Sequence, residues 1–247
     1  MDSSEFQFQF IHLNSVHSTN IYAFELLRQK NTVEGTVITT NYQEKGKGQL
    51  GQKWDSEKCK NLQFSIIMSP KIEVENQFQL SQLVAISLKE WLDTMAVDDV
   101  KIKWPNDILV KGKKIVGVLI ENSIQGREIS HSIIGIGINV NQESFANFTR
   151  PATSLRLELG HLLDRQLLLD DLLQLFYTNY VQFISGNLNL QQMYLNSLFG
   201  FGTPQQYSDE EGEFLGVILG VLPSGKLHVN RNGKLKSYDL KELKFLD

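Results

Sequence analysis

Residues 46–54 read Gly-Lys-Gly-Gln-Leu-Gly-Gln-Lys-Trp, and this stretch restricts the fold more than any other part of the chain. Its three glycines and two lysines are typical of a loop that holds an anion. Glycine lets a ligand approach the main chain and lets successive N–H groups turn toward phosphate oxygens, to which Lys47 and Lys53 would add positive charge. A solvated surface loop can have the same composition, so this stretch alone leaves both interpretations open.

The same glycines match the Gly-x-Gly-x-x-Gly pattern of dinucleotide-binding folds, which requires a helix directly after the loop. A strand is expected before it at 36–40, but residues 53–61 show no apolar helical period, and a strand-like run at 62–68 follows. The phosphate loop of nucleotide hydrolases is excluded as well, because Gly51 is followed by Gln52 where that loop needs Lys, and Lys53 is followed by Trp54 where it needs Ser or Thr. The anion must therefore be held in another way.

Apolar periodicity along the rest of the chain predicts an α+β fold. Phe6, Phe8 and Phe10 alternate with glutamines and predict a first strand, and Ser18 is placed to cap the helix that follows it. Further helices are expected at about 77–95, 165–185 and 191–198, and further strands at 100–104, 108–110, 115–120 and 128–140. From about residue 200 short apolar runs alternate with glycine turns such as Asn232-Gly233, which predicts a small antiparallel, barrel-like unit. We therefore expect domains at 1–198 and 199–247.

Composition narrows the functional classes. The chain has 247 residues, 41% of them hydrophobic, and a net charge of −4, which argues against a surface for DNA or RNA. A single cysteine, Cys59, excludes an intrachain disulfide, and no signal peptide or membrane span is evident, so we expect a cytoplasmic protein that binds no membrane. The five histidines have no metal-binding spacing, so no protein-held metal is expected, although Mg²⁺ can enter with a nucleotide.

Five motifs, taken in order, resemble biotin protein ligases over essentially the whole chain. They are His17-Ser18-Thr19-Asn20, Gln43 with the glycine loop, Lys103-Trp104-Pro105-Asn106-Asp107, residues 117–121 (GVLIE) and residues 135–139 (GIGIN). The resemblance implies a mixed-sheet catalytic domain of the class II synthetase-like biotin/lipoate ligase fold, with a C-terminal SH3-like β-barrel. It also implies a biotin-[acetyl-CoA-carboxylase] ligase, which uses ATP to form biotinyl-5′-AMP and transfers biotin to a lysine of a biotin carboxyl carrier domain.

The resemblance also implies roles for particular residues. Lys103 and Lys47 would be catalytic. The biotin site would comprise Ser18, Thr19, Asn20, Gln43, Gly46, Lys47, Gly48, Gln49, Lys103, Gly117 and Gly135. The ATP site would comprise Lys47, Gly48, Gln49, Trp54, Lys103, Asn106 and Asn139, with Trp54 stacked on adenine and Asn139 at its edge. The 46–54 loop would close over the intermediate.

Two departures from the family pattern are visible. The family's loop commonly carries arginine at three positions where this chain has Lys47, Gln49 and Gln52, so tight retention of the adenylate is in doubt. The Ser-Thr-Asn element begins at residue 18, so we expect a monofunctional member without an N-terminal DNA-binding domain. A lipoate-protein ligase and a non-catalytic biotin-binding protein stay open as alternatives, as does a homodimer.

Overall fold

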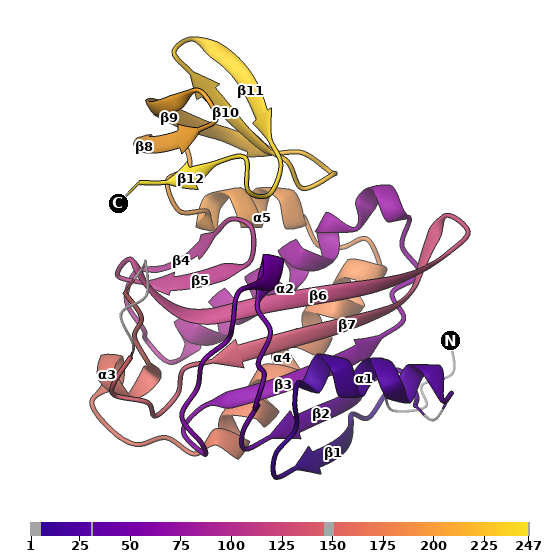
Figure 1. The fold of residues 1–247 in the computed structure, drawn as a ribbon. Coiled ribbons are helices and arrows are strands. Elements are labelled where there is room, and N and C mark those ends of the chain that lie inside the picture. Colours follow the sequence, from indigo (N-terminus) through magenta and orange to yellow (C-terminus); the bar gives the residue numbers. More distant parts are fainter. Residues whose placement is uncertain (1–5, 31, 146–150, 247) are drawn as a thin grey trace.

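The computed structural model describes residues 6–30, 32–145 and 151–246. Its main feature is a seven-stranded mixed sheet in the order β1-β2-β3-β7-β6-β5-β4 (Figure 1). Only the pairing of β1 with β2 is parallel among these strands, and the other neighbours are antiparallel. The strands are β1 (Gln9–Leu13), β2 (Thr36–Thr40), β3 (Leu62–Met68), β4 (Val100–Lys103), β5 (Asp107–Val110), β6 (Lys113–Gln125) and β7 (Glu128–Ile138).

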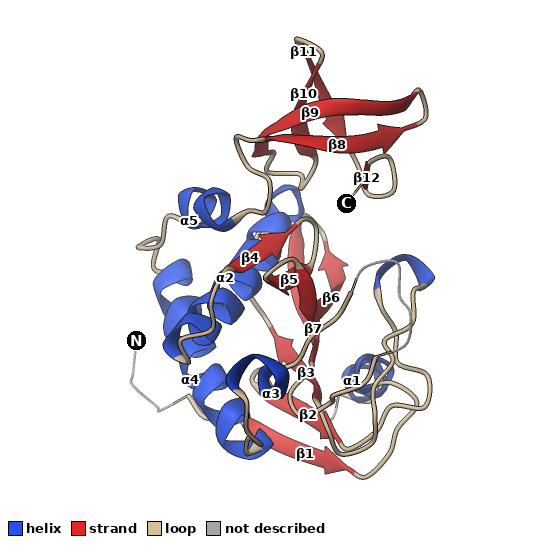
Figure 2. Cartoon of the chain, turned by 90° about the vertical axis from the view of Figure 1, so that its left-hand side faces the viewer, coloured by secondary structure: helices blue, strands red, loops and turns tan. Residues whose placement is uncertain are grey.

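Helices cover the two faces of this sheet unequally (Figure 2). The longer helices α2 (Phe78–Thr94) and α4 (Arg165–Ile184) pack on one face, where Leu80, Leu83 and Trp91 enter the main core. Helix α1 (Thr19–Arg28) packs on the opposite face against β2, β3 and β7. That face holds a smaller apolar cluster and leaves room for polar residues. The remaining helices are α3 (Leu155–Leu159) and α5 (Leu190–Ser197), with 3₁₀ turns at Gln49–Gly51 and Val74–Asn76.

A second, five-stranded antiparallel sheet forms the C-terminal part, in the order β11-β10-β9-β8-β12. Asn232 and Gly233 both have positive φ at the turn between β10 and β11, as the Asn-Gly signal predicts. In the described chain β11 and β12 are the two edges, and no pairing between them closes the sheet into the expected barrel. The strands are β8 (Pro204–Asp209), β9 (Gly212–Val221), β10 (Leu227–Arg231), β11 (Lys234–Tyr238) and β12 (Lys244–Phe245).

Apolar packing and a few polar contacts attach this sheet to the rest of the molecule. Buried residues of both sheets belong to one continuous hydrophobic cluster. The indole N–H of Trp104 donates to the carbonyl of Gly225 at 2.8 Å, and the N–H of Phe199 donates to the carbonyl of Ile102 at 2.7 Å. The tryptophan of the Lys-Trp-Pro-Asn-Asp motif therefore anchors the C-terminal sheet.

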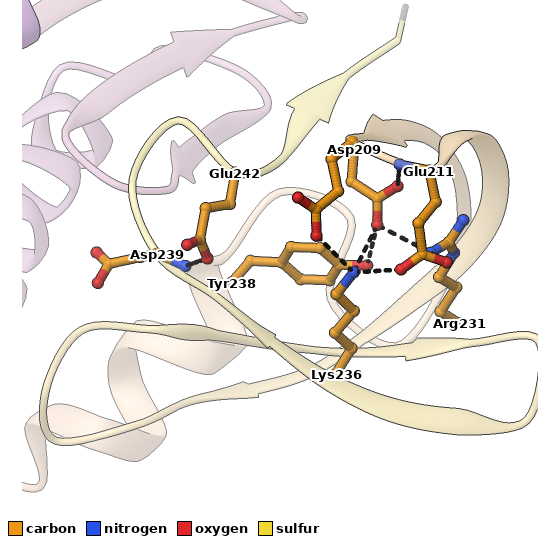
Figure 3. A network of polar contacts seen from close by, with 8 residues as sticks. Asp209, Glu211, Arg231, Lys236, Tyr238, Asp239 and Glu242 are labelled. Carbon is orange, nitrogen blue, oxygen red and sulfur yellow. Dashed lines mark hydrogen bonds and ion pairs between the residues drawn. The ribbon is translucent and has the colours of Figure 1, made fainter.

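Inside the C-terminal sheet, the carboxylate of Asp209 is the centre of a polar network (Figure 3). This carboxylate is 1% exposed and lies 3.0 Å from Arg231 and 3.2 Å from Lys236. It also accepts hydrogen bonds from the Tyr238 hydroxyl at 2.9 Å and the Glu211 N–H at 2.9 Å. Burial raises the pKa of Asp209, but these donors and cations outweigh burial and hold the pKa below its ordinary value.

The prediction of a strand at Phe6–Phe10 is wrong in its position. Strand β1 begins at Gln9, and Phe6 and Phe8 instead pack against the aromatic ring of Tyr177 on α4. Alternation in a short segment does not reveal that its apolar rings contact a helix outside the sheet. The other expected strands and helices are present with shifts at their ends, whereas α3, β8 and β12 were not foreseen. No helix in the described ranges is long and apolar enough to span a membrane.

Candidate functional site

A cavity of about 610 Å³ opens on the face of the large sheet that carries α1. Its wall is built from the start of α1, the glycine loop, β6 and β7, and the C-terminal segment. Of the residues predicted for the site, eleven line it: Ser18, Thr19, Asn20, Gln43, Lys47, Gly48, Gln49, Trp54, Asn106, Gly117 and Gly135. Segments more than a hundred residues apart in sequence therefore converge here.

The glycine loop folds back on itself as a narrow hairpin. The N–H of Trp54 donates to the carbonyl of Gly46 at 3.0 Å, and the N–H of Gly48 donates to the carbonyl of Gln52 at 2.7 Å. A Cβ on Gly46 would lie 2.4 Å from the Trp54 carbonyl oxygen, so a larger residue would force the two arms apart. Gly51 has a φ of +82°, the left-handed region that glycine tolerates. The amides of Gly48 and Trp54 are thus bonded within the loop in this conformation.

Trp54 lies flat on a floor made by two glycines. Gly117 of β6 and Gly137 of β7 are directly opposite each other in the sheet. A Cβ on Gly137 would lie 2.3 Å from the indole, and a Cβ on Gly117 would lie 3.0 Å from it. The ammonium of Lys114 is 5.7 Å from the indole centroid, a favourable cation–π distance. One face of the indole is therefore against the sheet, so a planar ligand must stack on its other face or displace it.

A compact set of neutral polar side chains lies at the start of α1, where Ser18, Thr19, Asn20 and Gln43 line the cavity. The backbone N–H of Thr19 donates to Oε1 of Gln43 at 2.8 Å. The Ser65 hydroxyl lies 2.7 Å from the Thr19 hydroxyl and 2.6 Å from Oδ1 of Asn20. Ser18 is the N-cap of α1, but its side chain makes no capping hydrogen bond. Ser18, Thr19, Asn20 and Ser65 are buried and Gln43 is half-buried, so the set forms a preorganised neutral recognition surface and not a solvated helix end.

Gly135 makes this polar set possible. A Cβ at this position would lie 2.2 Å from Oδ1 of Asn20. Asn20 is fixed from its other end, because its Nδ2 donates to the Glu121 carboxylate at 2.7 Å. The glycines of the 135–139 motif therefore support different side chains, Gly135 below Asn20 and Gly137 below Trp54.

The cavity wall also carries an excess of positive charge. Five lysines line it, together with a single carboxylate among the described lining residues, that of Asp107. Asp107 pairs with Lys114 at 2.6 Å. The lysines are Lys47, Lys53, Lys114, Lys241 and Lys244. Positive charge in excess over one paired carboxylate suits a polyanionic ligand.

Three predicted residues lie outside the cavity wall. Gly46 is buried beneath Trp54 in the loop hairpin. Asn139 is 4% exposed, and its side chain donates to the Thr153 carbonyl at 3.0 Å. The ammonium of Lys103 lies 4.7 Å from the ring centroid of Phe245. In the backbone pairing of β4 with β5, Lys103 is directly opposite the lining residue Asp107. Asn106 does line the cavity, and its amide donates to the Val118 carbonyl at 2.7 Å. The roles predicted for these residues stay predictions.

Sequence reasoning missed several lining residues. Gly137 and Asp107 lie within quoted motifs but had not been assigned roles, and Lys114 follows the β5–β6 turn. Lys241 and Lys244 come from the C-terminal segment, where no sequence signal indicated a contribution to this site. Groups of three or more His, Cys, Asp or Glu that could hold a metal ion are absent from the described residues.

Comparisons with known proteins agree on one family. The model of the biotin/lipoate A/B protein ligase family matches residues 13–139. The bifunctional ligase/repressor BirA of Bacillus subtilis is 32% identical over 230 residues, which cover 92% of this chain and 70% of that protein. A biotin–[acetyl-CoA-carboxylase] ligase of Paracoccus denitrificans is 28% identical, over 74% of this chain and 78% of that protein.

Solved structures give the same result. The biotin protein ligase from Aquifex aeolicus in complex with biotin and ATP superposes with a TM-score of 0.78 and 29% identity. The match covers 96% of this chain and 99% of that one. The chain belongs to the biotin/lipoate A/B protein ligase family.

Proposed function

We propose that this chain is a biotin protein ligase, which activates biotin with ATP to biotinyl-5′-AMP and then transfers the biotinyl group to a lysine of a biotin carboxyl carrier domain. One observation carries the proposal: a neutral polar pocket and a five-lysine wall meet in a single cavity beside Trp54. The substrate combines a neutral ring, a carboxylate and a nucleotide phosphate. The cavity offers a complementary surface for each of these parts.

The neutral polar side chains of the cavity suit the ureido ring of biotin, which has two N–H donors and one carbonyl acceptor. Thr19, Asn20 and Gln43 supply amide and hydroxyl groups without charge, and Ser18 adds a hydroxyl that does not cap the helix. A charged pocket would have to desolvate an ion against a neutral ring, at a cost in affinity. The dithiolane ring of lipoate has no ureido group to use these partners, which favours biotin over lipoate.

The lysines of the cavity wall suit the first chemical step, formation of the adenylate. The biotin carboxylate attacks the α-phosphate of ATP, pyrophosphate leaves, and two anions must approach each other. Fixed positive charge offsets their repulsion and the charge of the transition state. Lys47 lines the cavity, and Lys103 is next to it at the end of β4, so a rotation of its long side chain away from Phe245 would bring its ammonium to the carboxylate. Glycine-loop residues Gly48 and Gln49 would contact the phosphates.

The remaining groups of the substrates have candidate partners. Adenine would stack on the outer face of Trp54, and its edge would be read near Asn106 and Asn139. Mg²⁺ would be held mainly by phosphate oxygens, because Asp107, the one carboxylate among the described lining residues, is already paired with Lys114. Transfer to a carrier domain places the reaction beside biotin-dependent carboxylases, which we expect in the cytoplasm.

The direct test is to incubate the protein with biotin, ATP, Mg²⁺ and a biotin-carrier domain, and then to weigh the carrier. We expect one added biotinyl group. Pyrophosphate exchange into ATP, measured with biotin and with lipoate separately, distinguishes the two acids. Exchange with lipoate alone would contradict the proposal, and binding of biotin without exchange would favour a non-catalytic binding protein.

Lys103→Ala should abolish both adenylate formation and transfer. Lys101 is its matched control, since it lies on the same strand and the same face two residues earlier. Lys101→Ala should leave both steps close to wild type. Equal activity of the two variants would remove Lys103 from the catalytic machinery.

A further inference from the structure

Gln63 is a residue of β3, the strand that pairs with β7 in the large sheet. It is 2% exposed and is directly opposite Gly137 in the β3–β7 pairing. Directly opposite residues of an antiparallel pair project to the same face of the sheet. Because a Cβ on Gly137 would point at Trp54, the side chain of Gln63 is on the face that carries the cavity. It is not among the lining residues, so it can act on a ligand only through a neighbour.

That neighbour is Gln43. The amide of Gln43 is held at both ends, with Oε1 accepting from the Thr19 backbone N–H at 2.8 Å and Nε2 donating to Oε1 of Gln63 at 3.1 Å. A backbone N–H can only donate, so the end of Gln43 that faces Thr19 must be its oxygen. The end that faces Gln63 is then its nitrogen, and Gln63 must present its own oxygen. The Thr19 N–H at the start of α1 thus determines which way both amides point. The two hydrogen bonds form a relay from Thr19 through Gln43 to Gln63.

The relay leaves a definite group for a ligand. A primary amide has two N–H bonds and an oxygen with two lone pairs. The Oε1 of Gln43 also accepts from the Thr19 hydroxyl at 3.3 Å, so its contacts with Thr19 and Gln63 leave Gln43 one N–H for a ligand. The carbonyl oxygen of a cyclic urea can accept from this N–H.

We propose that Gln63 is a positioning residue for recognition of the cyclic urea, because it holds the Nε2 end of the Gln43 amide in place while the Thr19 backbone N–H fixes the Oε1 end. The inference rests on the proposed function and assigns a residue that does not touch the substrate. If Gln63 is replaced by methionine, Gln43 loses its only described hydrogen bond at Nε2, and its amide is held at the Oε1 end alone. Biotin affinity should then fall, whereas the contacts with ATP are unaffected.

The test is the dissociation constant of biotin alone, measured by calorimetry, together with the KM values for biotin and ATP. Gln63→Met should weaken biotin about fivefold to tenfold, the effect of one lost hydrogen bond, while the KM for ATP stays within about twofold. Gln63→Glu keeps an acceptor oxygen toward Gln43, so its biotin affinity should be closer to wild type. Gln82→Met is the matched control, because Gln82 is 3% exposed and is likewise hydrogen-bonded to a second glutamine, its Nε2 donating to Oε1 of Gln191 at 2.7 Å. This control should leave biotin binding unchanged.

A double-mutant cycle separates positioning from general packing. If Gln63 acts through Gln43, Gln63→Met should have little further effect on biotin binding in a Gln43→Met background. Additive effects, or a fall in kcat with an unchanged KM for biotin, would overturn the inference while leaving the proposed function intact. A wild-type protein that does not bind biotin would overturn both.

Discussion

At the scale of single residues, two glycines of β7 each make room for a different side chain of the cavity wall. Gly135 and Gly137 are on the same face of one strand, yet a Cβ on the first would meet Asn20 and a Cβ on the second would meet Trp54. Gly135→Ala should therefore raise the KM for biotin, and Gly137→Ala the KM for ATP, each by about tenfold or more, because a close-packed neighbour must move. Steady-state kinetics with each substrate varied in turn checks this. Gly220→Ala, where a Cβ meets nothing within 4 Å, is the control.

The two glutamines of the glycine loop affect how fast the adenylate intermediate dissociates. Gln49 and Gln52 both line the cavity but carry no charge. Gln49→Arg adds a planar cation that can grip a phosphate at two points, so the adenylate should dissociate more slowly, by about tenfold for one charge-assisted hydrogen bond. Stopped-flow release of pre-formed adenylate measures the rate. Lys234→Arg, which changes an exposed cation on β11, should leave it unchanged.

At the scale of elements, Asp209 makes the stability of the C-terminal sheet depend on pH. The pKa of Asp209 is lowered in the folded protein, so its contribution to stability is present above the ordinary carboxyl pKa, near 4, and is lost as the pH falls through the folded value. Asp209→Asn leaves Arg231 and Lys236 without this carboxylate and should lower the melting temperature at pH 7 by on the order of 5 °C. Acidification to about pH 3 should reduce the difference in melting temperature between Asp209→Asn and the wild type. Asp171→Asn, an exposed change on α4, should melt like wild type at both pH values.

At the scale of the whole molecule, the C-terminal sheet contributes to the cavity. Lys241 and Lys244 line it, and the contacts of Trp104 with Gly225 hold the sheet in place. Lys241→Ala and Lys244→Ala should each raise the KM for ATP, about tenfold in the double variant, without a change in biotin binding. Lys234→Ala is the control on the same sheet. Unchanged ATP kinetics in the double variant would show that these lysines take no part in nucleotide binding.

Local physics explains which elements could be predicted. Helix and strand periods are properties of short segments, so α2, α4 and the Asn-Gly hairpin are found close to their expected bounds. The misplaced first strand shows the limit, because Phe6 contacts Tyr177 far along the chain. The expected division between residues 198 and 199 stays a prediction, since one hydrophobic cluster contains residues from both sides of it.

The sequence by itself determined the residue types and their order: a neutral polar triplet, a glycine and lysine loop, and a cationic strand end that together indicate an adenylate-forming ligase. Only the tertiary structure decided that Gly117 lies opposite Gly137 beneath Trp54, that Gln63 supports Gln43, and that Lys241 and Lys244 reach the site. The physical reason is that strand register and burial depend on contacts between distant segments. The period of a strand reveals which residues share a face, but packing of the whole chain decides what that face meets.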